Sequence, residues 1–145
     1  MQLPTSVTSV AHVIQLAVAP VFLLTGVGAI LSVLVNRLGR VVDRFRALED
    51  AAPQSEVGKT ARATEMDIMA QRARMIHWAI GLCTGCALLV CVVIATLFVG
   101  SILGADVSIP IAALFILAML SLVSGLLCFL REISLAKGSI HVVPR

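Results

Sequence analysis

Three long apolar stretches dominate the pattern of hydrophobic and polar positions along the chain. They cover about residues 11–35, 76–102 and 109–130, and none of them contains Lys, Arg, Asp or Glu. A helix of ~20 apolar residues, at ~1.5 Å per residue, crosses the ~30 Å hydrocarbon core of a bilayer with its backbone groups satisfied internally. The pattern therefore predicts an all-α integral membrane protein with three transmembrane helices, in a single membrane domain formed by residues 1–145.

The segment between the first two apolar stretches, residues 36–75, also has the spacing of helices. Its apolar residues recur at intervals of three and four on both sides of a break at residues 51–58, which holds proline, serine and glycine. These apolar residues are Leu38, Val41, Val42, Phe45 and Leu48 before the break and Met66, Met69, Ala70, Ala73 and Ile76 after it. We expect an antiparallel helical hairpin whose arms pair Arg44 or Arg46 with Asp67.

Positive charge is confined to two parts of the chain. Of the eleven Lys and Arg, eight lie in the hairpin and three lie in the tail, residues 131–145, whereas residues 1–10 and 103–108 have none. By the positive-inside rule the hairpin and the tail are cytoplasmic and the amino terminus is outside. Three spans place the two ends on opposite sides, so this orientation is self-consistent.

Composition excludes several classes of protein. Hydrophobic residues make up 59% of the chain and charged residues 13%, which leaves too little polar surface for a soluble protein. The net charge of +3 comes from cations interspersed with acids, so we expect no nucleic-acid partner. Because no Lys or Arg precedes the first apolar run, we expect that run to remain as a span rather than to be cleaved as a signal peptide.

A stripe of polar and small residues follows one side of the first span. It comprises His12, Gln15, Phe22, Gly26 and Asn36. Polar side chains within a bilayer usually face the interior of a bundle or a water-filled cavity. Two interpretations remain open for this stripe: a helix-packing face, or the lining of a pore.

Three arginines lie at the predicted cytoplasmic ends of the spans. Arg37 and Arg40 follow the first span, and Arg131 follows the third. Such cations commonly anchor a helix at the lipid headgroups, and in a channel they form a ring at the inner mouth of the pore. Both interpretations stay open.

Small residues are spaced four apart in the other two spans. Gly81 and Gly85 form one such pair, and Ser121 and Gly125 form the second. Pairs of this kind let helices approach closely in lipid, where no hydrophobic force drives association. We expect them to mark helix-packing faces, within one chain or between the copies of a homo-oligomer.

The sequence contains no catalytic constellation. His12, His77 and His141 are far apart, no carboxylate is predicted inside the membrane, and no glycine-rich phosphate loop is present. Cys83 and Cys86 have the spacing of a redox or metal pair, but a thiolate in hydrocarbon is strongly disfavoured, so we expect structural cysteines. We expect no enzyme activity, no cofactor and no bound metal ion.

Several segments of the chain resemble a known family. From about His12 to Ala136 the chain is similar to the small bacterial membrane proteins grouped as domain-of-unknown-function family 2721, whereas the tail after Lys137 lies outside the resemblance. The segments are Ile14-Gln15-Leu16-Ala17, Ala19-Pro20-Val21-Phe22-Leu23-Leu24-Thr25-Gly26, Asn36-Arg37-Leu38 with Arg40, Asp43 and Arg44, Arg72-Ala73-Arg74 with Ile76, and Leu130-Arg131-Glu132-Ile133. The resemblance implies this architecture and a bacterial cytoplasmic (inner) membrane, and it implies no activity.

Two functions fit these observations. The first is a structural, accessory or scaffold protein that self-associates in the membrane and whose hairpin docks a protein partner. The alternative is a subunit of a homo-oligomeric channel lined by the first span. In both cases the partners include the lipid bilayer and further copies of the chain.

Overall fold

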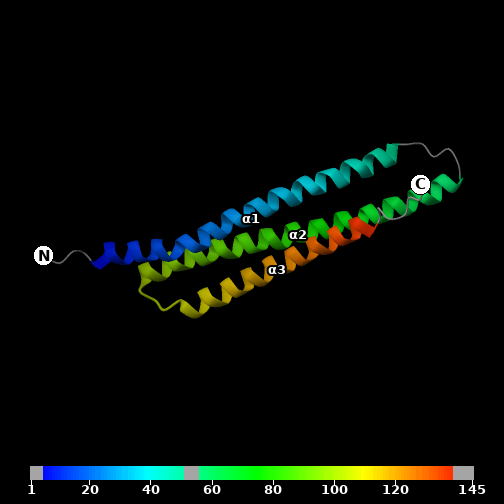
Figure 1. Ribbon diagram of the computed structural model, residues 1–145. Helices are drawn as coiled ribbons and strands as arrows, with labels where there is room; N and C mark the ends of the chain where they lie inside the picture. Colours follow the sequence, from blue (N-terminus) through cyan, green and yellow to red (C-terminus); the bar gives the residue numbers. More distant parts are fainter. Residues whose placement is uncertain (1–4, 51–55, 139–145) are drawn as a thin grey trace. The chain divides into compact units, whose positions relative to one another are not determined.

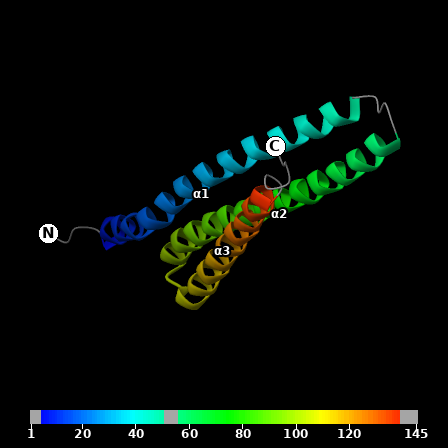
Figure 2. The same cartoon turned by 45° about the vertical axis from the view of Figure 1, so that its right-hand side comes forward.

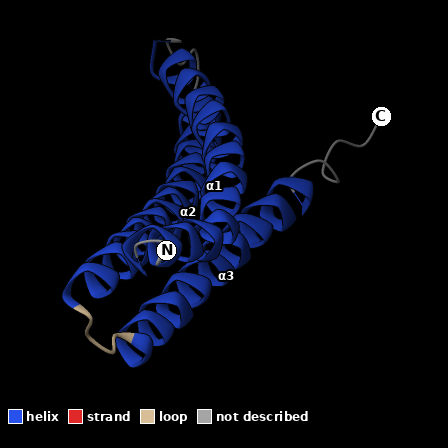
Figure 3. Ribbon diagram, turned by 90° about the vertical axis from the view of Figure 1, so that its left-hand side faces the viewer, coloured by secondary structure: helices blue, strands red, loops and turns tan. Residues whose placement is uncertain are grey.

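The computed structural model describes residues 5–50 and 56–138, which form three helices (Figure 1). They are α1, Thr5–Asp50, α2, Glu56–Leu103, and α3, Ser108–Gly138. Residues 104–107 form the loop between α2 and α3, drawn in tan in Figure 3, and all other residues of the described ranges are helical. The predicted all-α class is confirmed.

Each helix contains a segment that is long and apolar enough to cross a membrane. These segments are Val10–Ala47 in α1, Ala63–Leu103 in α2 and Ser108–Ser134 in α3. They include the three spans predicted from the sequence. The chain therefore has the architecture of an integral membrane protein with three helices of spanning length.

The first two helices continue well beyond their apolar stretches. The predicted break at residues 51–58 is too long, because α2 already begins at Glu56; residues 51–55 lie outside the described residues. Gly58 is thus inside the helix. A helical glycine costs about 1 kcal/mol relative to alanine, which a helix of 48 residues tolerates.

Buried positions recur at seven-residue intervals along each helix. In α1 they include Val13, Pro20, Val27, Leu34 and Val41, and Ala17 is buried four residues after Val13. In α2 they alternate by three and four residues, at Ile76, Ala79, Cys83, Cys86, Val90 and Val93. In α3 they are Ala118, Gly125 and Glu132. This spacing keeps one seam of a helix against its neighbours, as in left-handed helix packing.

The contacts divide the chain into two compact units. The first contains Met1–Ile30 and Leu82–Val123, and the second contains Leu31–Gly81 and Ser124–Arg145. Buried side chains of the first unit are apolar and come from all three helices: Val13, Ala17, Val27, Cys83, Cys86, Val90, Val93 and Ala118. Buried side chains of the second unit include Leu34, Val41, Ile76, Ala79 and, in contrast, Glu132. The second unit therefore carries the candidate site.

Within the first unit, α2 and α3 run antiparallel on either side of their loop (Figure 2). The hydroxyl of Ser121 donates a hydrogen bond of 2.7 Å to the backbone oxygen of Leu82. A Cβ atom placed on Gly85 would lie 3.6 Å from the same hydroxyl oxygen, which is ordinary van der Waals contact. These contacts show that the second and third apolar stretches are antiparallel neighbours.

The α2–α3 loop is closed by local backbone geometry. Gly104 has a φ of 62°, which L-residues with side chains rarely adopt, and the Ala105 backbone N–H donates to the Gly100 oxygen at 3.2 Å. Together these features form a Schellman cap at the end of α2. On the other side of the loop, the Asp106 carboxylate accepts from the Ser108 backbone N–H at 3.1 Å and from its hydroxyl at 2.6 Å. The loop therefore satisfies backbone groups that the two helix ends leave open.

Candidate functional site

A buried carboxylate lies at the centre of the second unit. Glu132 of α3 is 0% exposed, and it is the only charged residue buried among the side chains that the structure describes. An isolated charge in such surroundings would be very unfavourable, so a buried carboxylate requires partners of opposite charge. Glu132 has two, and they come from the other two helices.

The two partners are arginines that approach different oxygens of the carboxylate. Arg72 of α2 donates from Nε at 3.2 Å and from Nη2 at 3.0 Å, both to Glu132 Oε1. Arg37 of α1 places Nε 3.1 Å from Glu132 Oε2. This second contact has the distance of an ion pair but not the angles of a hydrogen bond, and Oε2 makes no hydrogen bond to any described residue.

Arg37 makes a further contact with α3. Its guanidinium carbon lies 5.4 Å from the centre of the Phe129 ring, within the range of a cation–π interaction. Because Phe129 and Glu132 are three residues apart, both lie on the same side of α3. Arg37 is therefore held by an aromatic face and a carboxylate from one helix.

Together these contacts form an ion triad that joins all three helices. The side chains of Arg37 and Arg72 are only 25% and 23% exposed, so the triad is shielded from water on most sides. Charges in such a setting interact more strongly than charges on an open surface, where ion pairs contribute ~0–1 kcal/mol. The triad fixes which residues of α1, α2 and α3 lie at the same level.

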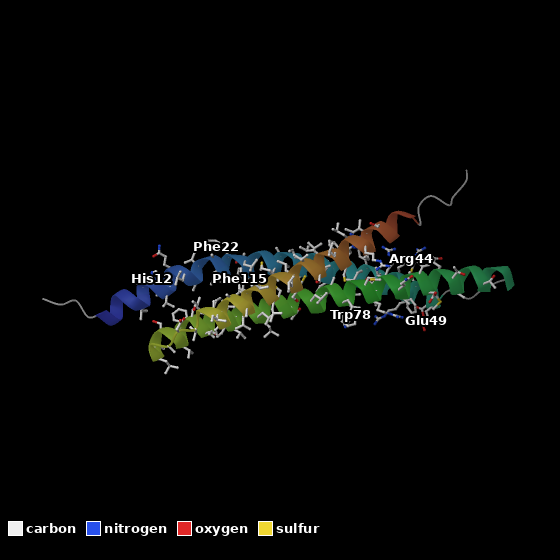
Figure 4. The ribbon with its side chains drawn as sticks, turned by 90° about the horizontal axis from the view of Figure 1, so that it is seen from below. His12, Phe22, Arg44, Glu49, Trp78 and Phe115 are labelled. Atoms are coloured by element: carbon white, nitrogen blue, oxygen red, sulfur yellow. The ribbon has the colours of Figure 1, made fainter. Side chains whose placement is uncertain are left out.

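A pocket rich in arginine adjoins the triad. Its volume is about 390 Å³, and α1 and α2 line it with Arg37, Arg40, Val41, Arg44, Met69 and Arg72. We call it the arginine pocket. Arg44, labelled in Figure 4, also forms an exposed ion pair with Glu65 of α2, in which Nη2 lies 3.4 Å from Oε1. The expected partner of Arg44 was Asp67, and the observed partner lies two residues earlier on α2.

Positive charge exceeds negative charge around the arginine pocket. Four guanidinium groups line it, whereas the carboxylates that pair with them are Glu132 and Glu65. Arg40 is exposed, and the structure records no ion pair for it within the described residues. The arrangement is therefore suited to hold an anion rather than a metal ion.

The stripe of the first span lies on the exposed side of α1. His12, Gln15, Gly26 and Asn36 are exposed, and Phe22 is 73% exposed. Figure 4 labels His12 and Phe22 on this helix. The buried positions of α1, from Val13 to Val41, are other residues than the stripe. Phe22 borders an apolar pocket that Ile94 and Phe98 of α2 also line. The two interpretations of the stripe, a packing face toward other proteins or a pore lining, stay predictions.

The predicted small residues take different positions. Gly85 and Ser121, placed in separate pairs by the sequence, contact each other across α2 and α3. Gly125 is buried, whereas Gly81 is exposed with no described atom within 4 Å of a Cβ built on it. Two of the four residues thus meet within this chain, and Gly81 is left on the surface.

Of the three predicted cations, Arg37 and Arg40 line the arginine pocket, whereas Arg131 is exposed. Sequence reasoning did not assign a role to Glu132 or Arg72. The signal that could have found them is the seven-residue spacing of the buried positions. Two steps of seven residues from Ala118 reach Glu132 in α3, and one step back from Ala79 reaches Arg72 in α2. Charged residues at seam positions point to a polar contact inside the bundle.

The described part of the chain contains no cluster of three or more His, Cys, Asp or Glu side chains that is arranged to hold a metal ion. Cys83 and Cys86 are both buried, and neither forms a disulfide. They occupy seam positions of α2, where small apolar side chains pack.

Comparison with known proteins gives one match. The family described as "Protein of unknown function (DUF2721)" matches residues 17–142. The match confirms the resemblance seen in the sequence and corrects its limits, because it begins five residues after His12 and includes most of the tail that was expected to lie outside. No curated protein and no solved structure matches the chain.

Proposed function

Because the chain belongs to the DUF2721 family, whose description names no function, we propose from its structure that it is a structural or accessory membrane protein that self-associates. The observation that carries this proposal is the ion triad of Arg37, Arg72 and Glu132. Its charged groups are directed at one another and tie three helices together, which is the arrangement of a structural centre. In this proposal the protein is not an enzyme.

Self-association is supported by small residues that this chain does not use for its own packing. Gly26 and Gly28 of α1 and Gly81 of α2 are exposed, and no described atom lies within 4 Å of a Cβ built on any of them. In lipid, such positions permit close contact with a helix of another copy.

Cross-linking in native membranes tests self-association. We expect a ladder above the monomer for the natural chain and its loss in Gly81→Leu, because a leucine there prevents close approach. Gly39→Leu is the matched control, since Gly39 is also exposed and has open space around it. Recovery of monomer alone from the natural chain would rule self-association out.

We further propose that the cationic ends of the helices lie in the cytoplasm of a bacterium and that the membrane is its inner membrane. The support is the distribution of Lys and Arg, which are absent from residues 1–10 and 103–108. In this orientation residues 36–75 form the cytoplasmic hairpin, which is the surface available to a soluble protein partner.

Affinity recovery from gently solubilised membranes tests the partner. Deletion of residues 49–62 should abolish recovery of a co-purifying protein while leaving membrane insertion intact. Unchanged recovery would mean that the hairpin only spaces the helices.

A channel is the second candidate, and the exposure of the α1 stripe favours it. The exposed side chains of the stripe, from His12 to Asn36, are available to surround a pore between copies. Purified protein in planar bilayers should then conduct, and Phe22→Ala should change the conductance, whereas Phe115→Ala on α3 should not. Bilayers that stay silent with inserted protein would exclude the channel.

A further inference from the structure

The arginine pocket has a surplus of donors that the ion triad does not use. A guanidinium carries five N–H groups. Arg72 donates from Nε and Nη2 to Glu132, which leaves Nη1, and Arg37 forms an ion pair with Glu132 through Nε, which leaves both terminal nitrogens. Arg40 adds a complete guanidinium. Glu132 therefore orients two arginines and leaves their outer nitrogens available to a ligand.

The lining arginines occupy successive levels along α1. The uncharged stretch of α1 ends just before Arg37. Arg40 and Arg44 follow at about 5 Å and about 10 Å further along the axis, at ~1.5 Å per residue. The polar headgroup layer on each side of a bilayer is about 5–8 Å thick beyond the hydrocarbon. The pocket therefore begins where the hydrocarbon ends and extends through the depth of the headgroups.

We propose that the arginine pocket binds a phosphate group, and that this phosphate belongs to an anionic lipid headgroup. Guanidinium forks match the geometry of phosphate oxygens and bind them through paired, charge-assisted hydrogen bonds. A volume of about 390 Å³ accommodates a headgroup. Val41 and Met69, which also line the pocket, supply apolar contact for the carbon atoms of the headgroup and its glycerol.

The acidic residues nearby leave the pocket positive. Glu65 and Glu132 pair with lining arginines, whereas Asp43 and Asp67 are exposed and do not line the pocket. One phosphodiester would offset part of the remaining positive charge. This inference goes beyond the proposed structural role and does not depend on self-association or on the orientation of the chain.

The test measures lipids retained by the purified full chain in a non-ionic detergent, by native mass spectrometry with phosphatidylglycerol and phosphatidylcholine as probes. We expect one phosphatidylglycerol per chain and no comparable retention of phosphatidylcholine. Arg40→Gln should weaken retention about tenfold, the effect of losing a charged hydrogen-bond donor. The fold should survive, because Arg40 is exposed and outside the triad.

Arg46→Gln is the matched control. It removes the same charge from the same helix, but Arg46 is exposed and does not line the pocket, so retention should stay within about twofold. Two results would overturn the proposed lipid site. One is equal retention of phosphatidylglycerol and phosphatidylcholine, and the other is an equal loss of phosphatidylglycerol retention in Arg40→Gln and Arg46→Gln.

Competition with inorganic phosphate distinguishes a lipid headgroup from free phosphate as the source of the bound phosphate group. Failure of millimolar phosphate to displace the bound phosphatidylglycerol supports the lipid. Displacement by phosphate, together with a thermal stabilisation that Arg40→Gln removes, would overturn the lipid assignment in favour of free phosphate.

Discussion

At the scale of single residues, Glu132 determines how the cationic segments of α1 and α2 can lie close together. Arg37, Arg40, Arg44 and Arg72 would repel one another without a counter-charge between them. A buried carboxylate that contacts Arg37 and Arg72 offsets part of this repulsion, and all four arginines line the pocket. The residue is thus both a packing element of the bundle and the group that orients the pocket.

The first prediction concerns Glu132→Gln. The amide keeps the size of the side chain but leaves two part-buried arginines without their counter-charge, so the free energy of unfolding should fall by about 3 kcal/mol. Denaturation of the purified protein in mixed micelles measures this. Glu65→Gln is the control: its carboxylate also pairs with an arginine of α1, but the two side chains are 44% and 64% exposed, so its loss should stay below about 1 kcal/mol. An equal loss of unfolding free energy in Glu132→Gln and Glu65→Gln would contradict the claim that the buried ion triad stabilises the fold more than an exposed ion pair does.

At the scale of elements, the α2–α3 loop is the most constrained connection in the described chain. Gly100 is buried at the end of α2, and a Cβ atom there would overlap the Val107 side chain. Gly104 then reverses the chain direction with its positive φ. Two glycines thus meet two different requirements, one for space and one for backbone conformation.

The second prediction follows from this difference in space. Gly100→Ala should lower the free energy of unfolding by about 1–3 kcal/mol through overpacking against Val107. Gly39→Ala, at an exposed helical position with open space, should be neutral or slightly stabilising because alanine favours the helix. Thermal unfolding of both variants in the same detergent measures the difference, and a destabilised Gly39→Ala would contradict it.

The third prediction concerns pH. Hydrogen bonds from the Ser108 hydroxyl and backbone N–H lower the pKa of Asp106 from its ordinary value of 3.8. A lowered pKa in the folded state stabilises the fold fully above the unfolded value, and this contribution is lost as the pH falls through the folded pKa. The natural chain should therefore be more stable than Asp106→Ala at higher pH, and this difference in stability should decrease only below pH 3.8. Thermal unfolding of both chains across that range measures it; a constant difference down to pH 2 would contradict the assignment.

The helical elements follow from the sequence because they depend on local properties, whereas the ion triad does not. Apolar length and the period of about three and a half residues predict the spans and the helical segments around Val41 and Met69. The partner choice of Arg44, Glu65 instead of Asp67, depends on the register between two helices, which a single sequence does not give. Glu132 is partly predictable. The seven-residue spacing in the sequence places it among the buried positions of α3, but its two arginine partners can be identified only once the packing of all three helices is known.

At the scale of the whole molecule, the ion triad constrains how the chain is proposed to cross the bilayer. Because α1, α2 and α3 contribute Arg37, Arg72 and Glu132 to one triad, the proposed arrangement places these three residues at one face of the membrane. The proposal places the loop that holds Asp106 at the opposite face. This constraint comes from the triad and is independent of the positive-inside rule.

Site-directed thiol labelling in intact cells tests this distribution most directly. Single cysteines at exposed positions, Ala47→Cys, Ser134→Cys and Asp106→Cys, are introduced into a chain whose four native cysteines are replaced by alanine. A membrane-impermeant reagent added outside should label Asp106→Cys alone, and it should label Ala47→Cys and Ser134→Cys only after the membrane is opened. Labelling of positions 47 and 134 from different sides would contradict the three-helix triad.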